Sequence, residues 1–171
     1  MNCRVVIVGF MGSGKTTVAD TLARRLGCDS LDLDSFIIER DGRSPAEIIE
    51  QDGEAAFRKI ETQALRDVLK RSEARVIALG GGAWAVEGNR NLVAEHDCLS
   101  VWLDAPFELC WERIVTSANT IRPLAPDRQS ALRLYNSRRS SYASANIQIA
   151  ANKKTPETSA TEIQRWLSKE G

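Results

Sequence analysis

The residues Val5-Val6-Ile7-Val8-Gly9-Phe10-Met11-Gly12-Ser13-Gly14-Lys15-Thr16 decide the fold of this chain. The aliphatic run at the start predicts a short buried strand. The remainder fits the pattern G-x-x-x-x-G-K-[ST], a loop whose backbone N–H groups surround phosphate oxygens. Beyond it, Val18, Leu22 and Leu26 recur at helical spacing, and Gly27 marks a helix end. Strand, loop and helix stand in the order that a phosphate-binding loop needs, which predicts binding of a nucleoside triphosphate.

The loop suggests a role for each of its polar groups. Glycine lets the backbone approach the phosphates closely, and the positive end of the following helix faces the anion. We expect Lys15 at the β- and γ-phosphates and the Thr16 hydroxyl on Mg²⁺, a cation that prefers oxygen ligands. The nucleotide-binding residues expected from this stretch are Gly12, Ser13, Gly14, Lys15, Thr16 and Thr17. A glycine-rich turn that carries Lys-Thr by chance is the alternative, and the flanking strand and helix argue against it.

The composition indicates a single domain that acts on small molecules. A chain of 171 residues can form its own core, so we expect one domain over residues 1–171. Lys plus Arg and Asp plus Glu both total 23, so no excess charge favours nucleic acid or a membrane surface. The four cysteines lack metal-ligand spacing, and nowhere do 18 apolar residues follow one another. We therefore expect a cytoplasmic protein with reduced thiols, and a monomer.

Apolar runs alternate with helical patterns along the whole chain. Such alternation predicts an α/β fold, with a parallel sheet covered by helices on both faces. Residues 116–128 contain two prolines and little periodicity, which predicts a mobile lid. Besides the first strand, we expect strands at 30–34, 75–79, 99–103 and 146–149, and helices at 45–51, 54–71, 128–141 and near the C-terminus around Ala160, Ile163 and Leu167. The expected architecture is a three-layer α/β/α fold with five parallel strands.

Polar residues near the predicted strand ends suggest a second substrate. Asp32 and Asp34 end the second predicted strand, where ligands of open α/β sheets collect. Gly80–Gly82 end the third, with exposed N–H groups and no side chains. Arg58 and Arg138 could each bind a carboxylate with two parallel hydrogen bonds. Taken singly, the aspartates could instead begin a helix and each arginine could be a surface charge.

Together these segments resemble the shikimate kinase family, in the same order from Arg4 to Leu167. The matching segments are the loop Gly9–Thr16, Asp32-Leu33-Asp34, Glu54-Ala55-Ala56-Phe57-Arg58 with Glu61, Gly80-Gly81-Gly82, Arg122-Pro123-Leu124 and Arg138-Arg139-Ser140-Ser141-Tyr142. The stretch Ala151–Pro156 resembles the adenine-side loop of the family less specifically.

Two departures from the family pattern bear on the site. Ser140 and Ser141 stand where the family has Pro and Leu, so either Arg138 or Arg139 could hold the substrate. Leu79 stands where the family often has threonine, which removes a hydroxyl near the phosphates.

The resemblance implies a P-loop kinase fold in which residues 34–62 form the substrate-binding helical region. It implies transfer of the γ-phosphoryl group of ATP to the 3-hydroxyl of shikimate, with Mg²⁺ as cofactor, in aromatic amino acid biosynthesis. Arg122, on the lid, would reach the transferring phosphate only on closure. The implied residues are Lys15, Asp34 and Arg122 for catalysis; Arg122 and Pro156 for the nucleotide besides the loop; Asp34, Arg58, Gly80, Gly81, Gly82 and Arg138 for shikimate; and Thr16 and Asp32 for the metal.

Other nucleotide-binding functions remain as alternatives. Another small P-loop kinase, acting on gluconate or a nucleoside, would share the first loop. Gluconate is the harder of these to exclude, because it is also a carboxylated polyol. A GTP-dependent switch normally reads guanine with Asn-Lys-x-Asp, and Asn152-Lys153-Lys154-Thr155 lacks the aspartate. A member of the family that binds nucleotide without catalysis is the last alternative.

Overall fold

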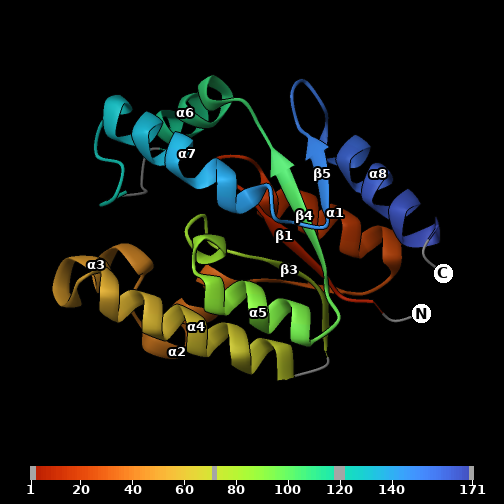
Figure 1. Cartoon of the computed structure of the whole chain (residues 1–171), viewed down its shortest axis with the longest axis horizontal. Coiled ribbons are helices and arrows are strands. Elements are labelled where there is room, and N and C mark those ends of the chain that lie inside the picture. Colours follow the sequence, from red (N-terminus) through yellow and green to blue (C-terminus); the bar gives the residue numbers. More distant parts are fainter. Residues whose placement is uncertain (1–2, 71–72, 118–121, 170–171) are drawn as a thin grey trace.

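The computed structural model describes residues 3–70, 73–117 and 122–169 and has the expected α/β architecture. Its strands form one sheet in the order β2-β3-β1-β4-β5, and every pairing in it is parallel (Figure 1). The strands are β1 (Val5–Val8), β2 (Asp29–Asp32), β3 (Ala74–Ala78), β4 (Leu99–Asp104) and β5 (Ile147–Ala150). All residues of β1 are buried because this strand lies at the centre of the sheet.

The helices follow the predicted spacing closely. They are α1 (Lys15–Leu26), α2 (Leu33–Asp41), α3 (Pro45–Asp52), α4 (Glu54–Lys70), α5 (Glu87–Glu95), α6 (Phe107–Thr116), α7 (Arg128–Tyr142) and α8 (Pro156–Lys169), with a short 3₁₀ helix η1 (Ala83–Ala85). Helix α1 ends at Gly27, which has a φ of 63°. Helix α3 begins with a capping box, in which Ser44 N donates to Glu47 Oε2 at 2.6 Å and Glu47 N to Ser44 Oγ at 3.2 Å. No helix in the described ranges combines the length and apolar character needed to span a bilayer.

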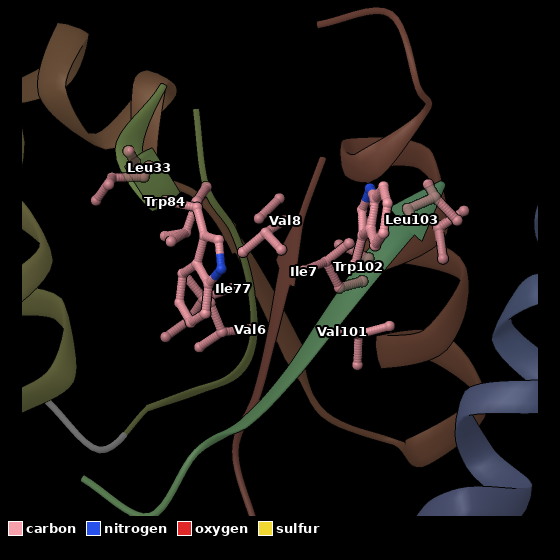
Figure 2. Close-up of a cluster of buried hydrophobic side chains, with 14 of the residues drawn as sticks. Val6, Ile7, Val8, Leu33, Ile77, Trp84, Val101, Trp102 and Leu103 are labelled. Carbon is pink, nitrogen blue, oxygen red and sulfur yellow. The ribbon is translucent and has the colours of Figure 1, made fainter. Parts of the chain in front are cut away.

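Helices cover both faces of the sheet, which gives three layers. Helices α1 and α8 pack against each other on one face, and α4 and α5 lie on the other (Figure 1). In Figure 2, Val6 and Val8 point from β1 toward Trp84, while Ile7 points the opposite way, toward Val101. This alternation follows from the two-residue period of a strand. The core therefore lies on both sides of β1.

The position of β1 also decides where ligands collect. From β1 the chain passes through α1 to β2, which lies at one edge of the sheet. Strands β4 and β5 lie between β1 and the opposite edge. In an open α/β sheet, such a reversal of strand order leaves a crevice beyond the carboxyl ends of the strands. The loop Gly9–Gly14 follows β1 at this point.

The second strand ends two residues earlier than predicted. It stops at Asp32, whose side chain accepts a hydrogen bond from Ser35 N at 2.9 Å and so caps α2. Asp34 lies in the first turn of α2, so the prediction that both aspartates end a strand was wrong for Asp34. The physical reason is that an aspartate at the N-cap satisfies free N–H groups of a helix, which a strand pattern does not reveal.

The predicted lid, residues 116–128, connects α6 to α7. Residues 118–121 lie outside the described residues, and residues 122–127 form neither helix nor strand. The movement of this segment stays a prediction.

Candidate active site

The loop between β1 and α1 depends on glycines that no other residue could replace without strain. Gly12 and Gly14 have φ values of 76° and 94°, in the left-handed region. A side chain on Gly12 would lie 2.7 Å from the carbonyl oxygen of Cys110, so the loop rests directly on the backbone of α6. No side chain caps the start of α1 at Lys15. Its first N–H groups therefore face the loop, where an anion can accept from them.

The side chain of Lys15 folds back onto the phosphate loop. Its Nζ donates to the carbonyl oxygen of Phe10 at 3.0 Å. Burial lowers the pKa of Lys15 to about 8, while the nearby carboxylates of Asp34 and Asp32 oppose that shift. A cation withdrawn from water interacts strongly with phosphate when one arrives.

The oxygen atoms of Thr16 and Asp32 lie together beside the loop. Thr16 Oγ1 donates to Asp32 Oδ2 at 2.7 Å. Within the described ranges, no group of three or more His, Cys, Asp or Glu side chains could hold a metal by itself. Mg²⁺ in phosphoryl-transfer sites binds through one or two protein oxygens together with phosphates and water. This donor pair therefore fits Mg²⁺ that arrives with a nucleotide.

Asp34 presents an oxygen atom that has no partner. Its Oδ1 is buried and has no hydrogen-bond partner among the described residues. Burial and the charge of Asp32 raise the pKa of Asp34, although Lys15 and Arg122 act in the opposite direction. A buried acceptor without a donor is costly, so its presence in a cavity wall indicates a ligand that brings a hydroxyl or similar donor.

Two guanidinium groups converge over Gly82. Arg138 Nη2 lies 2.8 Å from the point where a Cβ on Gly82 would be, and Arg58 Nη2 lies closer still. Arg58 donates to Glu61 Oε2 at 2.7 Å, whereas Arg138 forms no salt bridge with any of the described residues. Burial and, to a smaller extent, the charge of Arg58 lower the pKa of Arg138. Two neighbouring guanidinium groups match the charge and geometry of a carboxylate.

Asp34 and the two guanidinium groups line one cavity of about 90 Å³. Arg122 lies at its wall in this structure and acts electrostatically on Asp34. The polar lining is Asp34, Arg58, Glu61, Arg122 and Arg138 with the backbone of Gly80–Gly82, and the apolar lining is Met11, Pro45, Ala46, Ile49, Phe57, Pro123 and Leu124. Such a cavity suits a small ring that carries a carboxylate and hydroxyl groups.

A second cavity, of about 300 Å³, borders the phosphate loop. Gly12, Ser13, Gly14, Thr17 and Pro156 line it, as expected for nucleotide-binding residues, and Arg113 and Lys154 join them. Arg122, which the sequence also assigned to the nucleotide, lines the first cavity instead. The phosphate loop therefore contributes residues to both cavities.

The geometry distinguishes the two adjacent arginines of α7. Arg138 lines the first cavity and is 6% exposed. Arg139 points elsewhere and donates to Asp104 Oδ1 at 2.9 Å and to the hydroxyl of Tyr135 at 2.7 Å. Of the two candidates left open by the sequence, Arg138 is thus the one in contact with the cavity.

Sequence reasoning did not identify Arg113 as part of the site. Arg113 Nη1 donates to the carbonyl oxygen of Gly12 at 3.0 Å and lines the second cavity. No motif contains this residue, because it reaches the loop from α6, 101 positions away in sequence.

Glu61 was noted in the sequence but given no role. It is 1% exposed, and its Oε1 has no hydrogen-bond partner among the described residues. Burial raises its pKa to about 7, against the opposing charge of Arg58. The sequence does indicate that Glu61 is buried, because it stands four residues from both Phe57 and Leu65, on the apolar stripe of α4.

Comparisons with known proteins identify the family of this chain. The sequence model of the shikimate kinase family matches residues 11–168. The shikimate kinase of Geobacter sulfurreducens is 41% identical over 166 residues, which cover 95% of this chain and 90% of that protein. The shikimate kinase of Cereibacter sphaeroides is 39% identical over 167 residues, or 96% of this chain and 82% of that protein.

Solved structures give the same result. Shikimate kinase from Acinetobacter baumannii in complex with shikimate has a TM-score of 0.90 at 32% identity and covers 98% of this chain and 94% of that one. The enzyme from Aquifex aeolicus has a TM-score of 0.80 at 35% identity, with coverages of 98% and 97%. Because the family model and these relatives match over nearly the whole chain, the chain belongs to the shikimate kinase family.

Proposed function

We propose that this protein transfers the γ-phosphoryl group of ATP to the 3-hydroxyl of shikimate through the residues of the first cavity and the phosphate loop. The observation that carries this proposal is the pair of guanidinium groups over Gly82, in the same cavity as the unpartnered oxygen of Asp34. Shikimate is a ring with one carboxylate and three hydroxyls, so it offers a partner to both. The similar protein from Acinetobacter baumannii was solved with shikimate bound, which supports the same acceptor here.

Arg58 and Arg138 would hold the carboxylate of shikimate, and the bare backbone of Gly80–Gly82 would let the ring come close. A side chain on Gly80 would lie 2.8 Å from Asp34 Oδ1 and 3.2 Å from Glu61 Oε1. Only glycine therefore leaves room for a hydroxyl to reach Asp34. The apolar walls would cover the carbon face of the ring and exclude water.

On the nucleotide side, the loop N–H groups and Lys15 would bind the β- and γ-phosphates. The second cavity would take the nucleoside, with Arg113 and Pro156 among its walls. Thr16 and Asp32 would hold Mg²⁺, which withdraws negative charge from the phosphates when bound. The remaining work falls to positioning and electrostatics, as is general for phosphoryl transfer.

In the transfer step, the 3-hydroxyl oxygen forms a bond to the γ-phosphorus as the bond to the β,γ-bridging oxygen breaks. Asp34 orients the hydroxyl and accepts its proton, for which a raised pKa is favourable. ADP leaves with the bridging oxygen. Arg122 stabilises the transferring group, and closure of the lid keeps water from becoming the acceptor.

One copy of the chain suffices for this reaction, because each of these groups belongs to the same chain. We therefore propose a monomeric enzyme. Light scattering during gel filtration at assay concentration would give the mass directly. If the protein is a dimer at assay concentration and loses its activity when dilution dissociates it, this part of the proposal is contradicted.

The decisive experiment measures ADP release from ATP and Mg²⁺ with shikimate, gluconate, a nucleoside or no acceptor, in parallel. We expect turnover with shikimate alone and a product phosphorylated at the 3-hydroxyl. Turnover with gluconate but not with shikimate would overturn the assignment of the acceptor. Release at the same rate without any acceptor would indicate an ATPase instead.

A further inference from the structure

Helix α7 carries two tyrosines with closely similar surroundings. The hydroxyl of Tyr135 donates to the carbonyl oxygen of Ala105 at 2.9 Å and accepts from Arg139. The hydroxyl of Tyr142 donates to the carbonyl oxygen of Gly81. Burial raises the pKa of Tyr142, and the nearby charge of Arg138 opposes that rise. Arg138 Nη1 lies 3.5 Å from the point where a Cβ on Gly81 would be, so the guanidinium and the Tyr142 hydroxyl meet at the same glycine. Each tyrosine hydroxyl thus lies close to an arginine of α7 and donates to a backbone carbonyl, but only Tyr142 does so beside residues of the acceptor cavity.

The ring of Tyr142 is fixed before any ligand arrives. Tyr142 is 1% exposed and lies next to Trp102, with 6.0 Å between ring centres and 32° between ring planes. It follows Arg138 by one helical turn on α7, so the two side chains are neighbours on the helix surface. A phenol hydroxyl can donate one hydrogen bond and accept others, so it can serve Gly81 and Arg138 together.

Arg138 has few other restraints. It forms no salt bridge with the described residues, in contrast to Arg58, which pairs with Glu61 and Glu54. An arginine side chain has considerable rotamer freedom, and ordering it at the moment of binding would weaken affinity. The Tyr142 hydroxyl, one helical turn away and bonded to Gly81, is placed to order it in advance.

We propose that Tyr142 is a positioning residue, which holds the Arg138 guanidinium and the Gly81 peptide in the arrangement that receives the carboxylate and ring of the acceptor. The inference rests on the proposed function, because it concerns the same cavity. It assigns to Tyr142 an effect on acceptor binding rather than on the nucleotide.

The test compares Tyr142→Phe with the matched control Tyr135→Phe. Each variant removes one hydroxyl from α7 and keeps the ring, so the losses of thermal stability should be similar. We expect Tyr142→Phe to raise the KM for shikimate roughly tenfold, the usual effect of a lost hydrogen bond to a charged group. The KM for ATP should stay within about twofold of the wild-type value, and Tyr135→Phe should leave both constants near that value. Equal shikimate KM values in the two variants would overturn the inference.

A double-mutant cycle separates positioning from general destabilisation. In an Arg138→Ala background, Tyr142→Phe should cause little further rise in the shikimate KM, because the residue it positions is absent. If the fold-increase in shikimate KM of the double variant equals the product of the two single-variant increases, the inference is contradicted. If Tyr142→Phe folds poorly, both it and Tyr142→His are measured at low temperature, where the folded state persists. Tyr142→His keeps a ring N–H donor, so it should bind shikimate more tightly than Tyr142→Phe does. Absence of wild-type turnover with shikimate would instead refute the proposed function, which keeps the two failures distinct.

Discussion

Asp34 lies at the cavity wall with a buried oxygen atom that none of the described residues bonds to, and this arrangement leads to a prediction about its carboxylate. Asp34→Asn keeps the size of the side chain but cannot accept a proton. We expect kcat to fall by about a hundredfold or more, the usual contribution of a general base. ATP binding, measured by nucleotide titration, should persist. Near-normal turnover would assign Asp34 a structural part only.

Arg138 and Arg139 form a natural matched pair, because they are adjacent on α7 and only Arg138 lines the cavity. Arg138→Ala should cost about 1.5 to 3 kcal/mol of substrate binding, observed mainly as a higher shikimate KM. Arg139→Ala should leave that KM near the wild-type value and lower the melting temperature, since Asp104 loses its salt bridge and keeps only the hydrogen bond from Gln148. Steady-state kinetics and thermal unfolding give both quantities. A larger KM effect for Arg139→Ala would exchange the two roles.

The lowered pKa of Lys15 leads us to expect that the affinity for ATP falls at alkaline pH. Its pKa in the free protein is about 8, lowered by burial, and only the protonated ammonium attracts phosphate. Affinity should thus be insensitive to this group at lower pH and should weaken as pH rises above about 8. Calorimetric titration with nucleotide between neutral pH and pH ~9.5 would show the trend. Lys15→Met should bind more weakly throughout and lose this dependence, whereas an unchanged wild-type affinity up to the highest pH would contradict it.

At the level of residues, the sequence was informative wherever chemistry and spacing coincide in one segment. The loop, Arg58 and the triple glycine were identifiable because each stands in a motif of its own. Arg113 was not, since its contact with Gly12 depends on how α6 packs. Their presence at the cavities is observed, and the roles assigned to them stay predictions.

Among the elements, the lid is the one expected to move during the reaction. Arg122 has a buried Nε without a partner among the described residues, and burial lowers its pKa. Arg122→Ala should lower kcat by about a hundredfold or more, as loss of a transition-state donor does, with a much smaller change in the shikimate KM. The measurement is steady-state kinetics with both substrates varied.

A control for this variant lies at the end of the same segment. Arg128 pairs with Glu108 and stacks on Phe107, on the outside of α6. Arg128→Ala removes the same charge without touching the cavity, so its kcat should stay close to wild type. An unchanged kcat in Arg122→Ala would refute the role of Arg122 in transfer.

Helices were easier to predict than the polar second strand. Helix α3 begins where the Ser44 and Glu47 pattern indicates, because a capping box is a local feature. Strand β2 has no fully buried residue and carries aspartates, so its end was placed two residues too late. There the cap on α2 prevailed over the strand pattern.

At the scale of the whole molecule, Glu61 predicts how stability responds to pH. Its pKa rises from 4.5 to about 7 on folding, so the native state holds its proton more tightly than the unfolded chain does. The free energy of unfolding gained from this group is fully present below pH 4.5 and declines as pH rises toward about 7. A tenfold difference in proton affinity between the folded and unfolded states is equivalent to about 1.4 kcal/mol of stability.

Denaturant titrations across this pH range, on the wild type and on Glu61→Gln, would test it. The variant keeps the shape of the side chain but does not titrate, so its stability should vary less with pH. Identical pH dependence of the two proteins would show that Glu61 does not titrate in this range.

The sequence predicts the fold class of the molecule but not the order of the strands in the sheet. Alternating strands and helices indicate a parallel sheet, yet several strand orders satisfy that pattern. The order β2-β3-β1-β4-β5 emerges only when all the helices pack together. That order brings residues from distant parts of the chain to one edge of the sheet.

The connection from β2 to β3 is unusual in that it carries three consecutive helices, α2, α3 and α4, in place of one. Asp34, Arg58 and the apolar wall at Pro45, Ala46 and Ile49 all come from this single stretch. The phosphate loop and Arg113 belong to other connections. A contiguous piece of the gene therefore encodes much of the choice of acceptor, and evolution or an engineer could exchange that piece while leaving the machinery for ATP intact.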